Sequence, residues 1–114
     1  MPVDKQAIIR RLGGNEQLFE SICVRLFDLL PSQLSVLEEA VTQADRDTLF
    51  RAAHRLKGSV AYFDENNVTP TLVELEHLAK LPNWDGGRAR ILYLTLVAQV
   101  KELQADLEKL RQGA

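Results

Sequence analysis

The chain has 114 residues, of which 46% are apolar and 26% are charged, and its formal net charge is −2. These values are typical of one soluble globular domain spanning residues 1–114, and they exclude a disordered chain and the basic excess of nucleic-acid-binding proteins. The single cysteine excludes an intramolecular disulfide, and no apolar run approaches the roughly 18 residues that span a bilayer, so we expect a cytoplasmic protein without direct membrane contact.

The first predicted elements are a short helix near residues 4–12 and a long helix that Asn15 caps. After the cap, apolar residues recur every three or four positions, at Phe19, Ile22, Cys23, Leu26, Leu30, Leu34, Leu37 and Val41. Pro31 interrupts this stripe, which fits either one kinked helix or two stacked helices, and we favour the kinked helix. Cys23 lies inside the stripe and is interpreted as a small buried hydrophobic residue.

The second half of the sequence predicts three further helices. Asp45 is expected to cap a helix over residues 46–63, which the polar stretch "DENNVTP" closes. Thr69 and Pro70 are expected to cap and open a shorter helix with the inner stripe Leu72, Leu75, Leu78 and Ala79. "LPNWDGGR" is interpreted as a loop, followed by a long helix with the stripe Leu92, Leu96, Val100, Leu103, Leu107 and Leu110. We therefore predict an all-α fold, an antiparallel four-helix bundle with a short extra N-terminal helix.

The helix over residues 46–63 presents one histidine to solvent. At 100° per residue, the apolar residues Leu49, Ala53, Leu56, Val60 and Phe63 share one face, which is expected to face the core. His54 falls about 140° from Leu49 on this wheel and is therefore expected to be exposed. Its neighbours on the exposed strip are Phe50, which is also expected to be exposed, Lys57, Gly58 and Ala61.

This combination indicates a phosphoryl acceptor. Imidazole is largely uncharged near pH 7, so His54 can act as a nucleophile. Lys57, one turn on, offers a charge to phosphate oxygens, and Gly58 leaves room for a docking protein. Arg51 and Arg55 extend the positive rim. Each residue taken alone has an ordinary interpretation, as a solvated histidine or lysine or as a glycine at a close helix contact.

The sequence offers no group that would supply the phosphate. "LGGNE" and "WDGGR" lack the lysine and hydroxyl of a nucleotide-binding loop, and no acidic cluster suits Mg²⁺. Histidine kinases typically place an acid directly after the phosphorylated histidine, whereas Arg55 follows His54. We therefore expect a protein without nucleotide-dependent enzymatic activity, cofactor or metal of its own, with any Mg²⁺ held by a partner.

The stretch "AHRLKGS" resembles the signature of the histidine-containing phosphotransfer (HPt) domain family. The resemblance runs from about residue 4 to residue 110 and includes "LGGNEQLFESICVRLFDLLPSQLSVLEEAV" before the signature and "VELE" after it. It implies a helical bundle in which His54 carries a phosphoryl group between aspartates of receiver domains, or from a hybrid sensor histidine kinase to a response regulator.

The resemblance also assigns roles to single residues. His54 matches the phosphoacceptor, Lys57 the phosphate-side lysine and Gly58 the access glycine. Ser59 matches the signature serine, for which we expect a packing role. Glu76 matches a position where the family often has Gln or Glu near the histidine, and its two interpretations, orienting the ring or lying solvated, both stay open.

One departure from the family pattern is Asp64, which stands where the family usually has a glycine ten residues after the histidine. Asp64 can still end a helix, but it adopts a left-handed conformation less easily than glycine. The departure puts the loop geometry in question and leaves the acceptor assignment unaffected.

We expect a partner protein to dock on Phe50, Arg51, Arg55 and Ala61. Three other functions compete with the prediction of a phosphocarrier. An HPt-like adaptor would bind a receiver or kinase through the Phe50 and Ala61 surface without passing phosphate. A kinase dimerisation element would need an acid beside His54 or a nucleotide site, and a purely structural bundle would not explain an exposed glycine. We expect a monomeric phosphocarrier whose second histidine, His77, is not an acceptor because no glycine follows it four places on.

Overall fold

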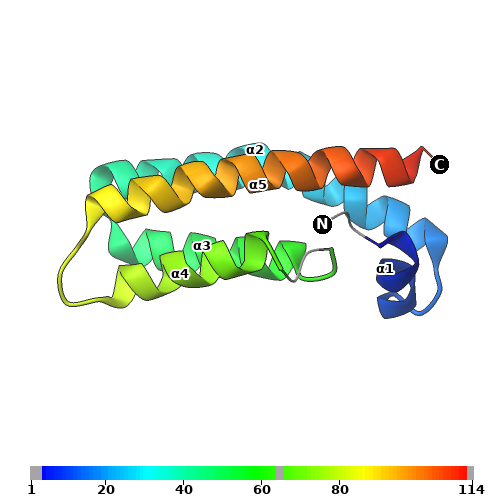
Figure 1. Cartoon of the computed structure of the whole chain (residues 1–114), viewed down its shortest axis with the longest axis horizontal. Helices are drawn as coiled ribbons and strands as arrows, with labels where there is room; N and C mark the ends of the chain where they lie inside the picture. Colours follow the sequence, from blue (N-terminus) through cyan, green and yellow to red (C-terminus); the bar gives the residue numbers. More distant parts are fainter. Residues whose placement is uncertain (1–3, 64–65, 113–114) are drawn as a thin grey trace.

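The computed structural model describes residues 4–63 and 66–112, which form five helices and no strand. The helices are α1 (Lys5–Arg11), α2 (Glu16–Gln43), α3 (Arg46–Val60), α4 (Val68–Lys80) and α5 (Gly86–Arg111). Helices α2 to α5 run alternately up and down, each packs against the next, and α5 returns to pack against α2 (Figure 1). The predicted all-α bundle with a short N-terminal helix is confirmed. None of the helices in the described ranges is long and apolar enough to cross a membrane.

Short polar side chains begin four of the helices. Asp4, Asn15, Asp45 and Asp85 each accept a hydrogen bond from a backbone N–H in the first turn of the helix that follows. Such caps satisfy N–H groups that have no acceptor within the helix. The predicted caps Asn15 and Asp45 are confirmed. Because Asp85 caps α5, this helix begins at Gly86, inside the stretch "LPNWDGGR", and the prediction of a loop there was wrong for its last three residues.

The ends of α3 and α4 differ from the prediction. Helix α3 ends at Val60 rather than at Phe63, and a turn closed by the Phe63 N–H and the Val60 carbonyl (2.9 Å) brings Phe63 into the core. Helix α4 begins at Val68, so Thr69 is not its cap. Pro70 lies within the first turn, where its missing N–H leaves no hydrogen bond unmade. The predicted effect of Asp64 falls on a residue outside the described ranges.

Pro31 lies inside one continuous helix, α2, and does not separate two helices. Buried residues occur on both sides of it, including Leu26, Leu30 and Leu37, and their burial outweighs the roughly 3 kcal/mol that an internal proline costs a helix. Cys23, in the same stripe, is fully buried, and burial raises the pKa of its thiol to about 11. The interpretation of Cys23 as a buried hydrophobic residue is confirmed.

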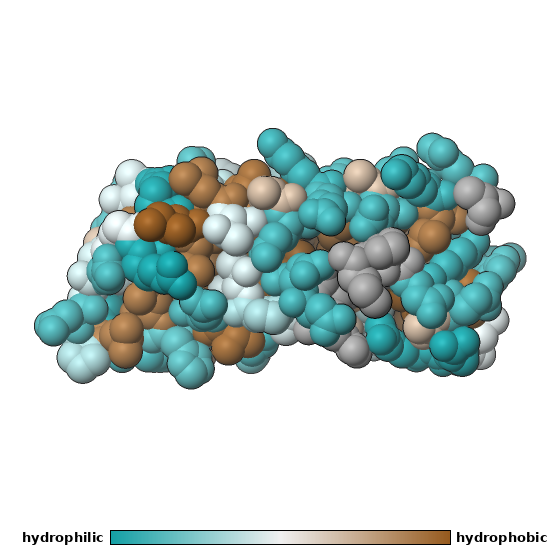
Figure 2. Space-filling model, in the orientation of Figure 1, coloured by the Kyte–Doolittle hydropathy of each residue, from teal (hydrophilic) through white to brown (hydrophobic). Residues whose placement is uncertain are grey.

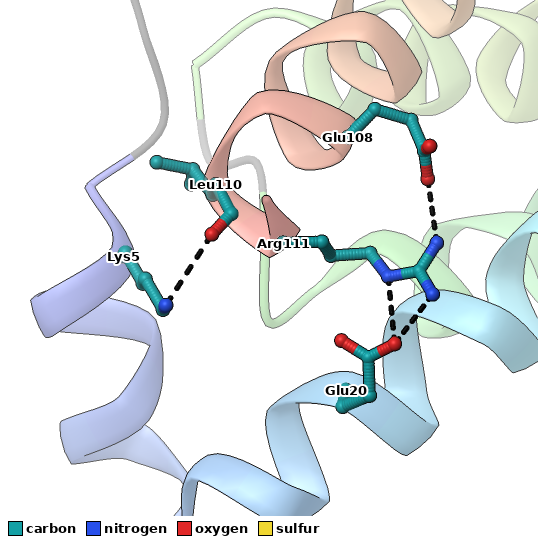
Figure 3. A network of polar contacts seen from close by, with 5 residues as sticks. All are labelled: Lys5, Glu20, Glu108, Leu110 and Arg111. Carbon is teal, nitrogen blue, oxygen red and sulfur yellow. Dashed lines mark hydrogen bonds and ion pairs between the residues drawn. The ribbon is translucent and has the colours of Figure 1, made fainter. Parts of the chain in front are cut away.

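Helices α2 and α5 extend beyond α3 and α4, and α1 lies against the extension (Figure 1). Ile8 and Ile9 of α1 are buried there. Polar contacts close the same end (Figure 3). Arg111 of α5 donates to Glu20 of α2 (Nε–Oε1 3.0 Å) and to Glu108 (2.6 Å), while Lys5 of α1 donates to the Leu110 carbonyl (3.3 Å). These contacts join α1, α2 and α5 at the end of the bundle that extends beyond α3 and α4.

The most exposed of the large apolar side chains lie just after α4 and in the first half of α5. Figure 2 shows brown apolar atoms among teal hydrophilic ones over this half of the face. Leu81, Ile91 and Leu94 are the most exposed large apolar residues, with 47%, 56% and 58% of their surface accessible. Leu81 also lies at the edge of the pocket described next.

Candidate functional site

Helix α3 has the two faces that its sequence predicts. Leu49, Ala53, Leu56 and Val60 are completely buried, whereas 67% of the His54 side chain is exposed. The helical period of 3.6 residues separates these faces, and the apolar face is held against α2 and α4. His54 is therefore fixed on a rigid helix with its ring in solvent.

A single carboxylate from α4 holds two residues of this exposed strip. Glu76 Oε2 lies 2.8 Å from His54 Nδ1, and Glu76 Oε1 accepts a hydrogen bond of 2.7 Å from Lys57 Nζ. The Glu76 side chain is only 8% exposed. Of the two interpretations of Glu76, the solvated one is wrong, because the residue is buried between α3 and α4 and lies within reach of both partners.

The protonation of this cluster follows from its contacts. Burial alone would raise the pKa of Glu76, but the hydrogen bonds from Lys57 and His54, together with their charges, outweigh burial and hold that pKa below its ordinary value. Glu76 is therefore ionised at neutral pH and can only accept hydrogen bonds. The Nδ1 atom of His54 must then carry the proton, which leaves the lone pair of a neutral ring on Nε2.

Phe50 is half-buried and not fully exposed as predicted, because its ring packs against the core and against other side chains of the site. The ring stacks on that of His54, with centroids 6.1 Å apart and planes 10° from parallel. The ammonium group of Lys80 also lies over the Phe50 ring, with Nζ 4.3 Å from the ring centroid. Phe50 is therefore part of the wall around His54.

Gly58 and Ser59 follow on the same helix. Gly58 is exposed, and no atom outside its own helical turn lies within 4 Å of the position that a Cβ would take. The alternative that Gly58 marks a close helix contact is therefore wrong. Ser59 is half-buried, and its hydroxyl donates to the Arg55 carbonyl of its own helix (3.3 Å).

The remaining predicted docking residues are exposed. Arg51 forms an ion pair with Asp47 on the preceding turn (3.1 Å), and Arg55 lies one turn further along α3. Ala61 lies just beyond the end of α3. All three residues are exposed, where a partner can reach them.

His54 lies in a pocket of about 550 Å³. Its lining residues are Phe50, His54, Lys57, Glu76, His77, Lys80 and Leu81. In the part of the chain that the structure describes, no cluster of three or more His, Cys, Asp or Glu residues is suited to a metal ion.

The sequence analysis missed Lys80, His77 and Leu81 as members of this pocket. A signal was present, because Glu76 and Lys80 are four residues apart and so share a face of α4. Lys80 also stands three residues after His77, as Lys57 does after His54, so the lysine spacing does not distinguish the two histidines. They differ in the carboxylate held against the ring of His54 and in the open surface at Gly58.

The position of Glu76 predicts an acid-dependent contribution to stability. Because its pKa is lower in the folded chain, the ionised carboxylate stabilises the fold at neutral pH, and this contribution is lost as the pH falls below about 4.5. We expect Glu76→Gln to lower the free energy of unfolding at about pH 6 and to lower it progressively less toward about pH 3. Urea denaturation at a series of pH values measures this difference. Glu102→Gln, on the exposed side of α5, controls for the loss of one charge. If the free energy of unfolding of Glu76→Gln differed from that of the wild type by the same amount at every pH, the lowered pKa of Glu76 would be contradicted.

One of three comparisons with known proteins finds a match for this chain. Residues 21–113 match the family model of the Hpt domain. A search of the curated proteins and a search of the solved structures each find no match. The matched range contains α3, α4 and α5 and most of α2, whereas α1 precedes it.

Proposed function

This chain belongs to the Hpt domain family, and we propose that it is a histidine phosphocarrier which passes a phosphoryl group between His54 and receiver-domain aspartates in a multistep two-component phosphorelay. Membership of the family implies histidine phosphotransfer, in a module rather than a nucleotide-dependent enzyme. The observation that carries the assignment to His54 is its exposed ring, whose Nδ1 is held by the buried carboxylate of Glu76.

The proposed transfer uses the free ring nitrogen. The Nε2 lone pair attacks the phosphorus of the receiver's aspartyl phosphate, the bond between phosphorus and the aspartate oxygen breaks, and its electron pair leaves with the aspartate carboxylate. The ring gains one positive charge and keeps its Nδ1 proton, and the carboxylate of Glu76 offsets that charge at 2.8 Å. Attack by a second aspartate on the phosphohistidine reverses these steps.

The neighbours of His54 support this chemistry. Lys57 Nζ uses one of its three donors on Glu76, and the remaining donors are available to phosphoryl oxygens. The open surface at Gly58 leaves room for the partner's aspartate. Receiver domains are the general partners of this family, and a receiver of a response regulator or of a hybrid sensor histidine kinase, docked on Phe50, Arg51, Arg55 and Ala61, remains our prediction. A cytoplasmic location also remains a prediction.

Incubation with a phosphorylated receiver domain tests the proposal. We expect phosphate to appear on the chain in an acid-labile, base-stable form, which is the behaviour of a phosphorus–nitrogen bond. The competing function, an adaptor without phosphotransfer, predicts that the receiver binds and the chain stays unlabelled. Binding of the receiver without labelling of the chain would therefore contradict the phosphocarrier function and support the adaptor function.

Lys57→Ala is expected to slow transfer from the receiver and to shorten the lifetime of the phosphohistidine, because it removes a charge beside the phosphoryl group. From the sequence alone, removal of a surface lysine is expected to lower the free energy of unfolding by less than about 0.5 kcal/mol. Because Lys57 is a partner of the buried Glu76, we instead expect Lys57→Ala to lower the free energy of unfolding by about 1–3 kcal/mol. Rates of label transfer and decay, with urea denaturation, measure both effects.

Lys101→Ala, which removes an exposed lysine from α5, is the matched control and should change neither quantity. Unchanged transfer and decay in Lys57→Ala would remove Lys57 from the site and leave it a partner of Glu76 alone.

A further inference from the structure

The charge of the pocket around His54 has to change when phosphate arrives. Before transfer, Lys57 and Glu76 are in direct contact, so their opposite charges offset each other. A phosphoryl group brings about −1.5 to −2 charges at pH 7, and the ring of His54 gains one positive charge. The pocket therefore becomes more negative by up to about one unit. Lys57 can still donate to phosphoryl oxygens, but its charge is already offset by Glu76, so the additional negative charge is best balanced by a cation that is not yet paired.

Lys80 is a cation in this pocket that has no anionic partner among the residues that the structure describes. It is exposed on the last turn of α4 and forms no ion pair with any residue in the described ranges. Its ammonium lies on the ring of Phe50, which in turn stacks on His54. A cation–π contact at an exposed site is weaker than a charge-assisted hydrogen bond to phosphate, so the ammonium gains by exchanging one for the other.

The backbone that carries Lys80 is held in place. Arg46 of α3 donates to the carbonyl of Ala79 (3.1 Å from Nε) and to that of Leu81, the residues on either side of Lys80. These bonds fix the backbone at the end of α4 against α3 and do not involve the exposed Lys80 side chain. A flexible four-carbon side chain on a fixed backbone can reach more than one position in the same pocket.

We propose that Lys80 is a second phosphate-binding residue, whose ammonium leaves the Phe50 ring and hydrogen-bonds the phosphoryl oxygens on His54. Lys57 orients Glu76 and contacts the phosphoryl group from one side, and Lys80 supplies the additional charge from α4. The inference rests on the proposed function, since it requires phosphate on His54.

Nuclear magnetic resonance of the full chain tests this directly, with phosphoramidate as the phosphate donor so that no partner is needed. In the unphosphorylated chain, the Phe50 ring current should shift the Lys80 Cε protons upfield. We expect this shift to disappear when His54 is phosphorylated. In a ³¹P titration, Lys80→Gln should raise the apparent pKa of the phosphoryl group, because a neighbouring positive charge is lost, and Lys80→Arg should restore it.

Lys101→Gln is the control for removal of a remote positive charge and should leave the ³¹P titration unchanged. If neither phosphoramidate nor a phosphorylated receiver labels His54, both the proposed function and this inference are wrong. If His54 is labelled while the Lys80 protons keep their shift and Lys80→Gln titrates like the wild type, the inference alone is overturned. Thermal unfolding of Lys80→Gln verifies that the variant is folded.

Discussion

His54→Gln should abolish phosphate acceptance and leave the fold unchanged. The glutamine amide can donate to Glu76 as Nδ1 does, so the buried carboxylate keeps a partner, but the amide nitrogen has no available lone pair for attack on phosphorus. Because most of the His54 side chain is exposed, no core contact is lost. Incubation with a phosphorylated receiver, followed by detection of label on the chain, should show transfer to the wild type and none to the variant.

His77→Gln is the matched control, because His77 lines the same pocket and also has a lysine three residues on. It should accept phosphate as the wild type does. Phosphate label on His54→Gln, or loss of the label in His77→Gln, would show that His54 is not the phosphoacceptor.

Gly58→Leu should keep or raise the thermal stability while reducing transfer from a receiver domain on the order of 100-fold. A side chain at this position meets open space, and leucine is the better helix former by up to about 1 kcal/mol. The same side chain would stand one turn from His54, on the surface that the partner's aspartate has to approach. Phosphoramidate needs no docking surface and should still label His54. Melting temperature and the two labelling rates measure the three effects.

Gly58→Ala, with a single added methyl group, should fall between the wild type and Gly58→Leu in transfer from the receiver. If Gly58→Leu transferred phosphate normally, the partner would dock elsewhere, and Phe50 and Ala61 would lose their proposed role. Unfolding of the variant would contradict the open space found around Gly58.

Local features of the fold could be predicted from the sequence. The two faces of α3 follow from the helical period alone, and the caps at Asn15 and Asp45 depend on residues at most three positions away. Helix ends were less predictable, because they depend on which of several competing local hydrogen bonds forms. Asp85 shows this, since its cap begins α5 inside a glycine-containing stretch that otherwise indicates a loop.

The partners of His54 could be predicted only in part. The wheel gives the direction of a side chain, but it does not say what the neighbouring helix places there. The burial of Glu76, the stacking of Phe50 and the position of Lys80 all depend on how α4 packs against α3. That packing joins residues about 20 to 30 positions apart, and no single-helix pattern contains it.

The most direct test of the central claim is to identify the phosphorylated nitrogen. In a chain labelled with ¹⁵N at histidine and phosphorylated by a receiver domain, the phosphorus coupling and the ring nitrogen shifts identify the bonded atom. Because Nδ1 is held by Glu76 at 2.8 Å, the phosphocarrier assignment predicts phosphate on Nε2 of His54 and a proton still on Nδ1. Phosphate on Nδ1 of His54, or on any other residue, would contradict it.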